Sequence, residues 1–235
     1  MAPPHARSKP QRPDRRSPTD DVPETIEDDV FGTAGAVRSP PRQERSRRRY
    51  WFIVVAAAEL FATIGYEATT MEAIASAAAT SIGSVYRFFP NKPAVFRAVA
   101  TVALAQIESV VLEVLELVER GAGWEDLLDA AIDRLALVHR EDPAVRAVLT
   151  NIQLYAEYAE QDEQLTRKLV AVTAGLFARW AASMPEAQRL VVATMVVQTI
   201  AGILVFAQRE PLPVADAMLA ELKLMLHRYL EPLID

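Results

Sequence analysis

The feature that most constrains this fold is a close series of helix start and stop signals between residues 44 and 97. Residues 44–64 carry apolar side chains at helical spacing, and Gly65 follows as a natural left-handed stop. A second helix is expected to start near Thr69 or Thr70, because either hydroxyl can cap it. The apolar face of the first helix is predicted to comprise Ile53, Ala57, Leu60, Phe61 and Ile64.

A short third helix is predicted to begin at Ser81, which can cap it, and to end near Phe88, before Pro90. Asn91 can cap a long fourth helix, which tolerates Pro93 in its first turn. Two short helices joined by a tight turn and followed by a longer helix are what a helix-turn-helix unit requires. In such a unit the second short helix enters the major groove of DNA.

Composition divides the chain into three parts. Residues 1–42 are rich in Pro, Arg, Ser and Asp and poor in large apolar residues, so we expect a disordered tail. Residues 43–90 are the predicted helix-turn-helix domain, and residues 91–235 are a larger helical domain. With no convincing strand in either domain, the expected fold class is all-α.

After the long fourth helix, five further helices are predicted in the larger domain. Asp142 before Pro143 is a helix start signal, since Asp caps and Pro suits the first helical position. Ser183 and Glu186 have the spacing of a capping box. The five helices are expected at about 124–140, 143–158, 161–183, 186–209 and 214–231.

The net charge of −6 is unevenly distributed. Residues 44–97 carry seven Lys and Arg against four Asp and Glu, whereas residues 98–235 carry eleven against twenty. An acidic protein is a poor candidate for coating nucleic acid. A basic segment on an acidic body can nevertheless bind phosphates locally.

The sequence predicts neither a metal site nor a bound cofactor. There is no cysteine, and the three histidines, His5, His139 and His227, are far apart in sequence, so only a site made of carboxylates alone stays open as an alternative. An enzyme in the acidic helical domain is an alternative, but no nucleophile elbow, phosphate-binding loop or paired-histidine motif supports it. We therefore expect a protein that is not an enzyme.

One uncharged stretch raises the question of a membrane. Residues 190–207 contain eighteen residues without a charge, which is near the lower limit for a membrane span. Gln198 and Thr199 interrupt the stretch, and no second span accompanies it. We interpret it as a buried helix, with no membrane contact, and expect a cytoplasmic protein because the polar N-terminus is no secretory signal. A helical interaction or membrane-associated protein remains the alternative.

The predicted third helix has the surface that a DNA-reading helix needs. Its inner face carries Val85 and Phe89, whereas its outer face is small, polar or basic. Hydroxyl groups can bind phosphate oxygens, and the charge of Lys92 favours phosphate as well. The basic run that begins the first helix is a second candidate, either for phosphates or simply as a solvated face. The predicted DNA contacts are Arg48, Thr70, Ser81, Ile82, Gly83, Ser84, Tyr86, Arg87 and Lys92.

These residues carry a resemblance to a known family. The run GYEATT (65–70) and the following MEAIASAAATSIGSVYRFFPNK (71–92) resemble the DNA-binding region of the TetR family of transcriptional regulators. Upstream, AAAELFATIG (56–65) resembles the end of that family's first helix, and Ala94 to Val99 resembles the start of its fourth. The resemblance covers about residues 46–99.

The chain departs from the family pattern at four positions. Ala79 stands where the turn usually has Gly, so a slightly different or a mildly strained turn is expected, and Thr80 replaces a usual Val. Ile82 occupies a position that is often polar or basic, where its side chain can only offer an apolar contact, for example to a thymine methyl group. Phe88 replaces a common His or Tyr, which removes one phosphate contact.

The resemblance implies a homodimeric repressor that binds a palindromic DNA operator in successive major grooves. It also implies that residues 91–235 bind an unidentified small-molecule effector, which changes the spacing of the two DNA-reading helices. The two last helices correspond to the usual dimerisation pair. Their stripe of Val214, Met218, Leu222, Met225 and Tyr229 fits either a dimer face or ordinary core.

The ligand pocket is expected among the central helices of the larger domain. Aromatic side chains mixed with a few polar groups are typical of small-molecule pockets, and equally of a helical core. The acidic domain favours a cationic or neutral apolar ligand over an anionic one. The candidate ligand contacts are Tyr155, Tyr158, Phe177, Trp180, Met195, Gln198 and Thr199.

Overall fold

The computed structural model describes residues 44–234, so the predicted tail over residues 1–42 lies outside it. Within the described residues every regular element is helical, which confirms the all-α prediction. The elements are α2 (Glu44–Thr63), α3 (Gly65–Ala68), α4 (Met71–Ala77), α5 (Ile82–Phe88), α6 (Lys92–Glu119), α7 (Trp124–Glu141), α8 (Pro143–Thr150), the 3-10 helix η1 (Ile152–Glu157), α9 (Ala159–Trp180), α10 (Glu186–Ala207), α11 (Leu212–Leu230) and the 3-10 helix η2 (Glu231–Leu233).

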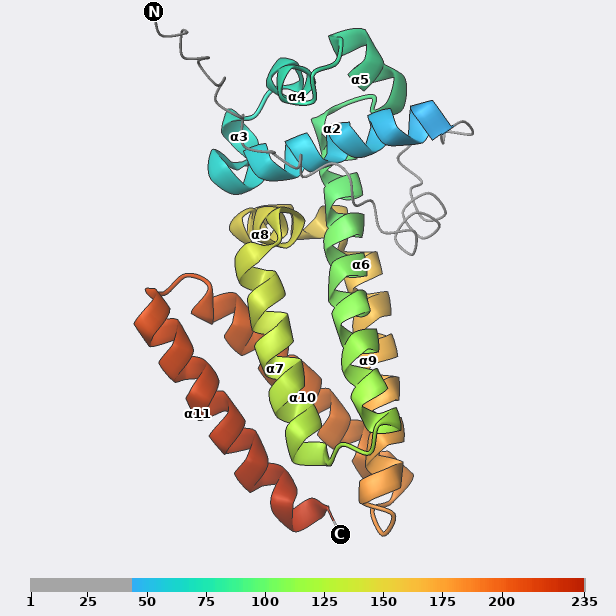
Figure 1. The fold of residues 1–235 in the computed structure, drawn as a ribbon, viewed down its shortest axis with the longest axis vertical. Helices are drawn as coiled ribbons and strands as arrows, with labels where there is room; N and C mark the ends of the chain where they lie inside the picture. Colours follow the sequence, from blue (N-terminus) through green and yellow to red (C-terminus); the bar gives the residue numbers. More distant parts are fainter. Residues whose placement is uncertain (1–43, 235) are drawn as a thin grey trace, which may run out of the picture.

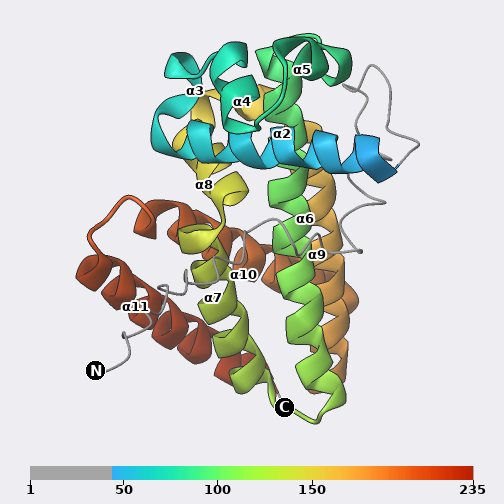
Figure 2. The same ribbon diagram turned by 45° about the horizontal axis from the view of Figure 1, so that its top comes forward.

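The helices form a small unit at one end of the molecule and a larger bundle below it (Figure 1). Helices α2 to α5 make the small unit, and α6 runs from it along the bundle. Helix α8 lies across the top of the bundle and packs against α2 (Figure 2). The remaining long helices, α7, α9, α10 and α11, complete the bundle.

Most helix starts follow the predicted capping residues. Thr70 caps α4, Ser81 caps α5, and Asn91 caps α6 through a 2.9 Å hydrogen bond from the Ala94 backbone N–H. Asp142 caps α8 by accepting the backbone N–H groups of its first turn. These side chains satisfy N–H groups that have no partner inside their helices, which is why the helices begin there.

Four boundaries add to the prediction or differ from it. Of the two residues expected to cap α4, Thr70 is the cap and Thr69 is not, because the Thr69 hydroxyl is buried and donates to the Gly65 carbonyl oxygen at 2.7 Å. A one-turn helix, α3, lies between α2 and α4. Ile64, which was predicted to lie on the apolar face of the first helix, is 52% exposed just before α3. Helix α10 begins after Pro185 without a side-chain cap.

The fourth difference is a break in the predicted helix over residues 143–158. Helix α8 stops at Thr150, Asn151 leaves the helical conformation with φ −115° and ψ 45°, and a 3-10 helix follows. The Asn151 side chain is buried and bonded to other elements. Helix α8 therefore ends where Asn151 bonds to other elements, although the apolar periodicity of the sequence predicted that it continues to residue 158.

Two cores hold the fold together. The first joins the small unit to the upper part of α6 and to α8, so these parts share buried side chains. The second lies lower in the bundle, between α7, α9, α10 and α11. Among the described helices, α6 and α10 are long and apolar enough to cross a membrane, but core helices of soluble proteins pass the same test.

Candidate DNA-binding interface and ligand cavity

The turn between α4 and α5 is tight and contains one strained residue. Ala79 has φ +47°, a left-handed conformation that alanine rarely adopts because of its Cβ. The Thr80 backbone N–H then bonds to the Ala75 carbonyl oxygen at 2.9 Å, which closes the end of α4. The expectation of a strained turn at Ala79 is confirmed.

Helix α5 is fixed at its start and open on its outer face. The Ser84 backbone N–H donates to Ser81 Oγ at 3.2 Å, and the two hydroxyl oxygens are 2.9 Å apart. Ile82 and Tyr86 are 37% and 43% exposed, which is high for large apolar side chains. A Cβ built on Gly83 would meet no atom within 4 Å, so internal packing does not require glycine there.

The inner face of α5 is anchored by aromatic rings. Val85, Phe88 and Phe89 are buried, and the rings of Phe88 and Phe89 lie 5.9 Å and 5.1 Å from that of Tyr50 on α2. Phe88 therefore fills the core at a position where the resemblance suggested a lost phosphate contact. Its burial gives a physical reason for an apolar ring, since a polar tip would need a partner there.

Thr70 and Arg87 stand at the edges of this surface. Both are exposed, and Thr70 Oγ1 already accepts the Ala73 backbone N–H at 3.1 Å. Capping does not exclude a second contact, because a hydroxyl has one donor and two acceptor sites. Arg87 lies over the Phe88 ring, with its guanidinium carbon 5.8 Å from the centroid. Arg48 is exposed on the first turns of α2.

Lys92 has a structural role that its sequence position did not suggest. Its ammonium donates to the carbonyl oxygens of Tyr66 at 2.7 Å, Thr69 at 2.9 Å and Glu67 at 3.3 Å. It also lies 4.2 Å from the centroid of the Tyr66 ring. Lys92 thus connects α3 and the following Thr69 to the start of α6, and its contact with DNA phosphate stays a prediction.

Asn151 connects the bundle to the small unit by hydrogen bonds, a role that the sequence did not predict. Its Oδ1 accepts the Tyr66 backbone N–H at 2.9 Å, and its Nδ2 donates to the carbonyl oxygens of Phe61 and Ala147 at 3.2 Å and 2.7 Å. The residue is 3% exposed. It therefore links the end of α8 to α2 and α3. An asparagine at the end of an apolar helix is the only sequence signal it gives.

A cavity of about 210 Å³ lies between α6, α7, α9 and α10. Its walls are mainly aliphatic and aromatic, as in most small-molecule sites. Two of the predicted ligand residues, Phe177 and Trp180, line it, together with Trp124, which was not predicted. The polar side chains in its wall are those of His139, Asp162, Thr166 and Thr173.

The other five predicted ligand residues do not line this cavity. Tyr158 is buried beneath the small unit, and Tyr155 donates to Asp162 Oδ2 at 3.1 Å without lining the cavity itself. Met195 and Gln198 are exposed on α10, and Thr199 is half-buried there. The register of α10 explains this difference, because its cavity face consists of Val196, Val197, Ile200, Ala201 and Leu204.

Two titratable groups in the cavity wall have shifted pKa values. Burial lowers the pKa of His139, whose Nδ1 lies 2.7 Å from the Leu135 carbonyl oxygen and must donate to it. The neutral imidazole then keeps Nε2 as an acceptor. Burial also raises the pKa of the Asp162 carboxyl, although the hydrogen bond from Tyr155 opposes that shift.

Helices α10 and α11 pack against each other, and both expose large apolar side chains. The predicted stripe on α11 is divided, since Leu222 is buried within the chain whereas Val214, Met225 and Tyr229 are exposed. The interpretation as ordinary core therefore holds for Leu222 but not for the three exposed residues. The large apolar side chains exposed on the two helices are Leu190, Val191, Met195, Phe206, Leu212, Val214, Leu224, Met225 and Tyr229.

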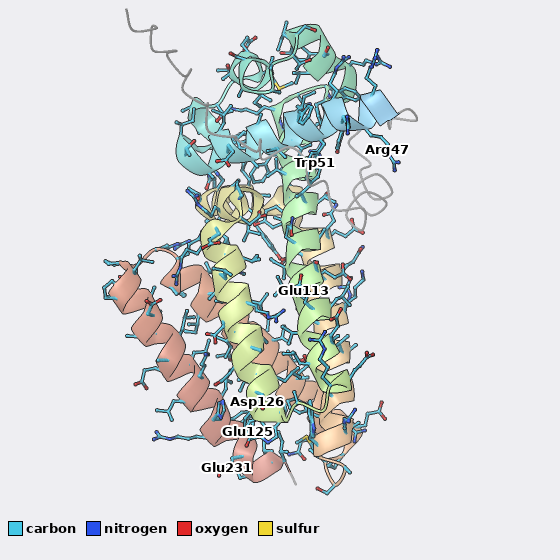
Figure 3. All side chains as sticks on the ribbon, in the orientation of Figure 1. Arg47, Trp51, Glu113, Glu125, Asp126 and Glu231 are labelled. Atoms are coloured by element: carbon cyan, nitrogen blue, oxygen red, sulfur yellow. The ribbon has the colours of Figure 1, made fainter. Side chains whose placement is uncertain are left out.

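Figure 3 shows three acidic side chains, Glu125, Asp126 and Glu231, near the end of the bundle away from α5, and Glu113 part-way along α6. Over residues 44–234, no group of three or more histidine and carboxylate side chains could hold a metal ion.

Comparison with known proteins identifies the family. A family model for bacterial regulatory proteins of the tetR family matches residues 53–99, and one for the tetracyclin repressor-like C-terminal domain matches residues 123–230. No curated protein matches the chain. Among solved structures, a TetR-family transcriptional regulator from Streptomyces coelicolor is 26% identical, with a TM-score of 0.58 over 79% of this chain and 99% of that chain.

Two further structures share the fold at lower identity. NalD, the secondary repressor of the MexAB-OprM multidrug efflux pump in Pseudomonas aeruginosa, is 21% identical, with a TM-score of 0.57 over 79% of this chain and 96% of that chain. AibR in complex with isovaleryl coenzyme A and operator DNA is 20% identical, with a TM-score of 0.51 over 74% and 97%. With both of its parts matched by family models, the chain belongs to the TetR family of transcriptional regulators.

Proposed function

We propose that this regulator is a homodimeric repressor that binds a palindromic operator through α5 and releases it when a small molecule enters the cavity. The observation that carries the DNA-binding part is the outer face of α5. There Ile82, Gly83 and Tyr86 are exposed, and Gly83 has no packing reason to be glycine. A close approach to DNA supplies that reason.

In this proposal, different residues contact the DNA phosphates and the DNA bases. The hydroxyls of Thr70, Ser84 and Tyr86 bind phosphate oxygens, with Arg48, Arg87 and Lys92 adding charge. Ile82 reads sequence by an apolar contact, and Ser81 serves mainly as the cap of α5. AibR supports the DNA-binding part by analogy, because it shares the fold and has been solved with operator DNA.

The dimer is supported by the exposed apolar surface of α10 and α11. Single exposed apolar residues are common on protein surfaces, but this many large ones on two neighbouring helices are not. Their contact with water is unfavourable. A second copy of the chain, packing the same two helices, would cover it. Met225→Glu should then yield monomers in light scattering, whereas Glu221→Gln on the same helix should leave dimers.

The effector is a neutral, mainly apolar small molecule. The aromatic and aliphatic walls favour an apolar body, and neutral His139 offers an acceptor to a ligand hydroxyl or amide donor. AibR, which shares the fold, was solved in complex with a ligand of other chemistry, isovaleryl coenzyme A. The wall residues of this chain, and not the fold, therefore decide the ligand class.

Mobility shift with genomic fragments, beginning with the DNA beside the protein's own gene, tests the DNA-binding part. We expect salt-sensitive, sequence-selective binding. Tyr86→Phe should weaken binding to all sequences alike, since it removes a phosphate contact, whereas Ile82→Thr should change sequence preference. Absence of selective binding to any fragment would contradict the proposal.

A further inference from the structure

A second cavity, with different chemistry, lies between α7, α8, α11 and the end of α10. Its volume is about 530 Å³, within the range of small-molecule sites. His139 and Leu204 line both cavities and so form the wall between them. The apolar part of the lining of the second cavity includes Ala136, Leu149, Leu204, Ala207, Ala215 and Leu219.

Three arginines surround this apolar surface. Arg140 already pairs with Asp216, with 3.0 Å between nitrogen and oxygen. No ion pair joins Arg146 or Arg209 to another residue within the described part of the chain. Glu210 is the only acidic residue in the cavity wall, so the wall is net positive. This is a local reversal of charge, because residues 98–235 carry eleven basic and twenty acidic side chains.

Guanidinium groups bind carboxylate, sulfonate and phosphate groups through two parallel N–H bonds, and they do so more strongly beside apolar surface than in open water. The exposed Thr150 hydroxyl is a further donor in the same wall. We propose that this cavity is a second effector site, which binds an amphiphilic organic anion. Arg146 and Arg209 hold the anionic group, and the apolar part of the ligand rests on the aliphatic surface.

The position of the site connects it to the DNA-binding unit. Arg146, Leu149 and Thr150 belong to α8, and Asn151, the next residue, is bonded to Tyr66 and Phe61 of the small unit. A ligand that binds Arg146 and Arg209 together therefore exerts a force on α8, the helix that packs against α2. This regulatory part rests on the proposed function, whereas binding of the anion does not.

The test uses two fluorescent probes of nearly the same shape on the full chain. Anilinonaphthalene sulfonate is an amphiphilic anion, and N-phenylnaphthylamine is its neutral counterpart. We expect the Arg146→Gln and Arg209→Gln double variant to weaken sulfonate binding by about tenfold or more, since a charged hydrogen bond contributes about 1.5–3 kcal/mol. Binding of the neutral probe should change less than about twofold, on the same scale.

Two control variants separate this site from other surfaces. Arg179→Gln removes the same charge from an exposed position of α9 outside both cavities and should leave sulfonate binding unchanged. Thr173→Trp fills the smaller cavity and should weaken only the neutral probe. Unchanged sulfonate binding in the double arginine variant would overturn the site.

The regulatory part has its own readout. For a DNA fragment that the wild type binds selectively, saturating sulfonate should change the affinity in the wild type but not in the double arginine variant. An equal change in both proteins, or none in either while the probe binds, would overturn regulation through α8. Failure to find any bound DNA would count against the proposed function and leave the probe titration as the test of the site.

Discussion

The side-chain oxygen of Asn151 accepts the backbone N–H of Tyr66 at 2.9 Å, across 85 residues of sequence. The same side chain donates to Phe61 and Ala147, so its amide group makes three hydrogen bonds while buried. The bundle is therefore joined to the DNA-binding unit by a polar contact of fixed geometry as well as by apolar packing. The three hydrogen bonds of this amide fix the position of α8 relative to α2 and α3.

Replacing Asn151 by Leu should destabilise the protein strongly. Leucine has a similar size but leaves the Tyr66 N–H and the Phe61 carbonyl oxygen buried without their partner, which costs about 1–3 kcal/mol per group. We expect the free energy of unfolding to fall by about 2–4 kcal/mol in chemical denaturation followed by circular dichroism. Gln153→Leu, at an exposed position of η1, is the control and should have little effect. Equal stabilities of the two variants would show that the hydrogen bonds of Asn151 do not stabilise the contact between α8 and the DNA-binding unit.

Gly83→Ala should separate folding from DNA binding. Gly83 is the second residue of α5, where alanine stabilises the helix by less than the about 0.5–1 kcal/mol of a helix interior, and the added Cβ meets no atom within 4 Å. We expect a higher melting temperature but weaker DNA binding, because the methyl group keeps α5 away from the groove. Gly175→Ala on α9, where the added Cβ is equally unhindered, should raise stability without changing DNA affinity. Unimpaired DNA binding by Gly83→Ala would show that α5 does not approach DNA closely there.

Ala79→Gly should relieve the strained turn. A left-handed alanine costs about 1–2 kcal/mol, and glycine adopts φ +47° freely, although glycine also gains entropy in the unfolded state. We expect a net gain of about 0.5–1 kcal/mol in the free energy of unfolding. Ala77→Gly, two residues earlier in α4, should instead destabilise by about 1 kcal/mol. A loss of stability at both positions would mean that the turn is unstrained.

The stability of the protein should depend on pH through His139. Burial lowers the folded-state pKa of its imidazole below the ordinary value of 6.5, so the unfolded chain binds the proton more tightly. Above pH 6.5 both states are neutral at this group, and the group adds no pH dependence. Below pH 6.5 the unfolded state is protonated first, and stability falls until the folded-state pKa is reached.

The variant His139→Gln tests this dependence. Urea unfolding over a pH series should give a smaller loss of stability below pH 6.5 for His139→Gln than for the wild type. Gln153→Leu, at an exposed position, retains His139 and should keep the wild-type slope. Identical slopes for wild type and His139→Gln would contradict a buried neutral histidine at this position.

The sequence predicted local structure well wherever one side chain decides it. Ser81, Asn91 and Asp142 cap helices as expected, because capping depends only on an oxygen near the next N–H groups. The end of α8 at Asn151 could not be predicted, because its partners lie on elements far away in the chain. Likewise, the exposed position of Ile64 follows from α3, which periodicity did not reveal.

The two candidate sites were predictable to different degrees. The surface of α5 could be placed from capping and spacing, since both act within a few residues. The cavity could not, because it depends on how four helices rotate against one another. Met195 and Gln198 lie on the same helix as the cavity-lining Val196 and Val197, but on its exposed side. The average acidity of the bundle likewise gave no sign of the arginines around the second cavity.

Enrichment of random duplex DNA by the protein is the measurement that tests the central claim most directly. The wild type should select a palindromic sequence, and Ile82→Gln should change the selected bases at symmetric positions, because glutamine can bond to adenine where isoleucine cannot. The other selected positions should persist, since the phosphate contacts are unchanged. Selection of no common sequence by the wild type, or of the same bases by both proteins, would contradict the assignment of α5 as the DNA-reading helix.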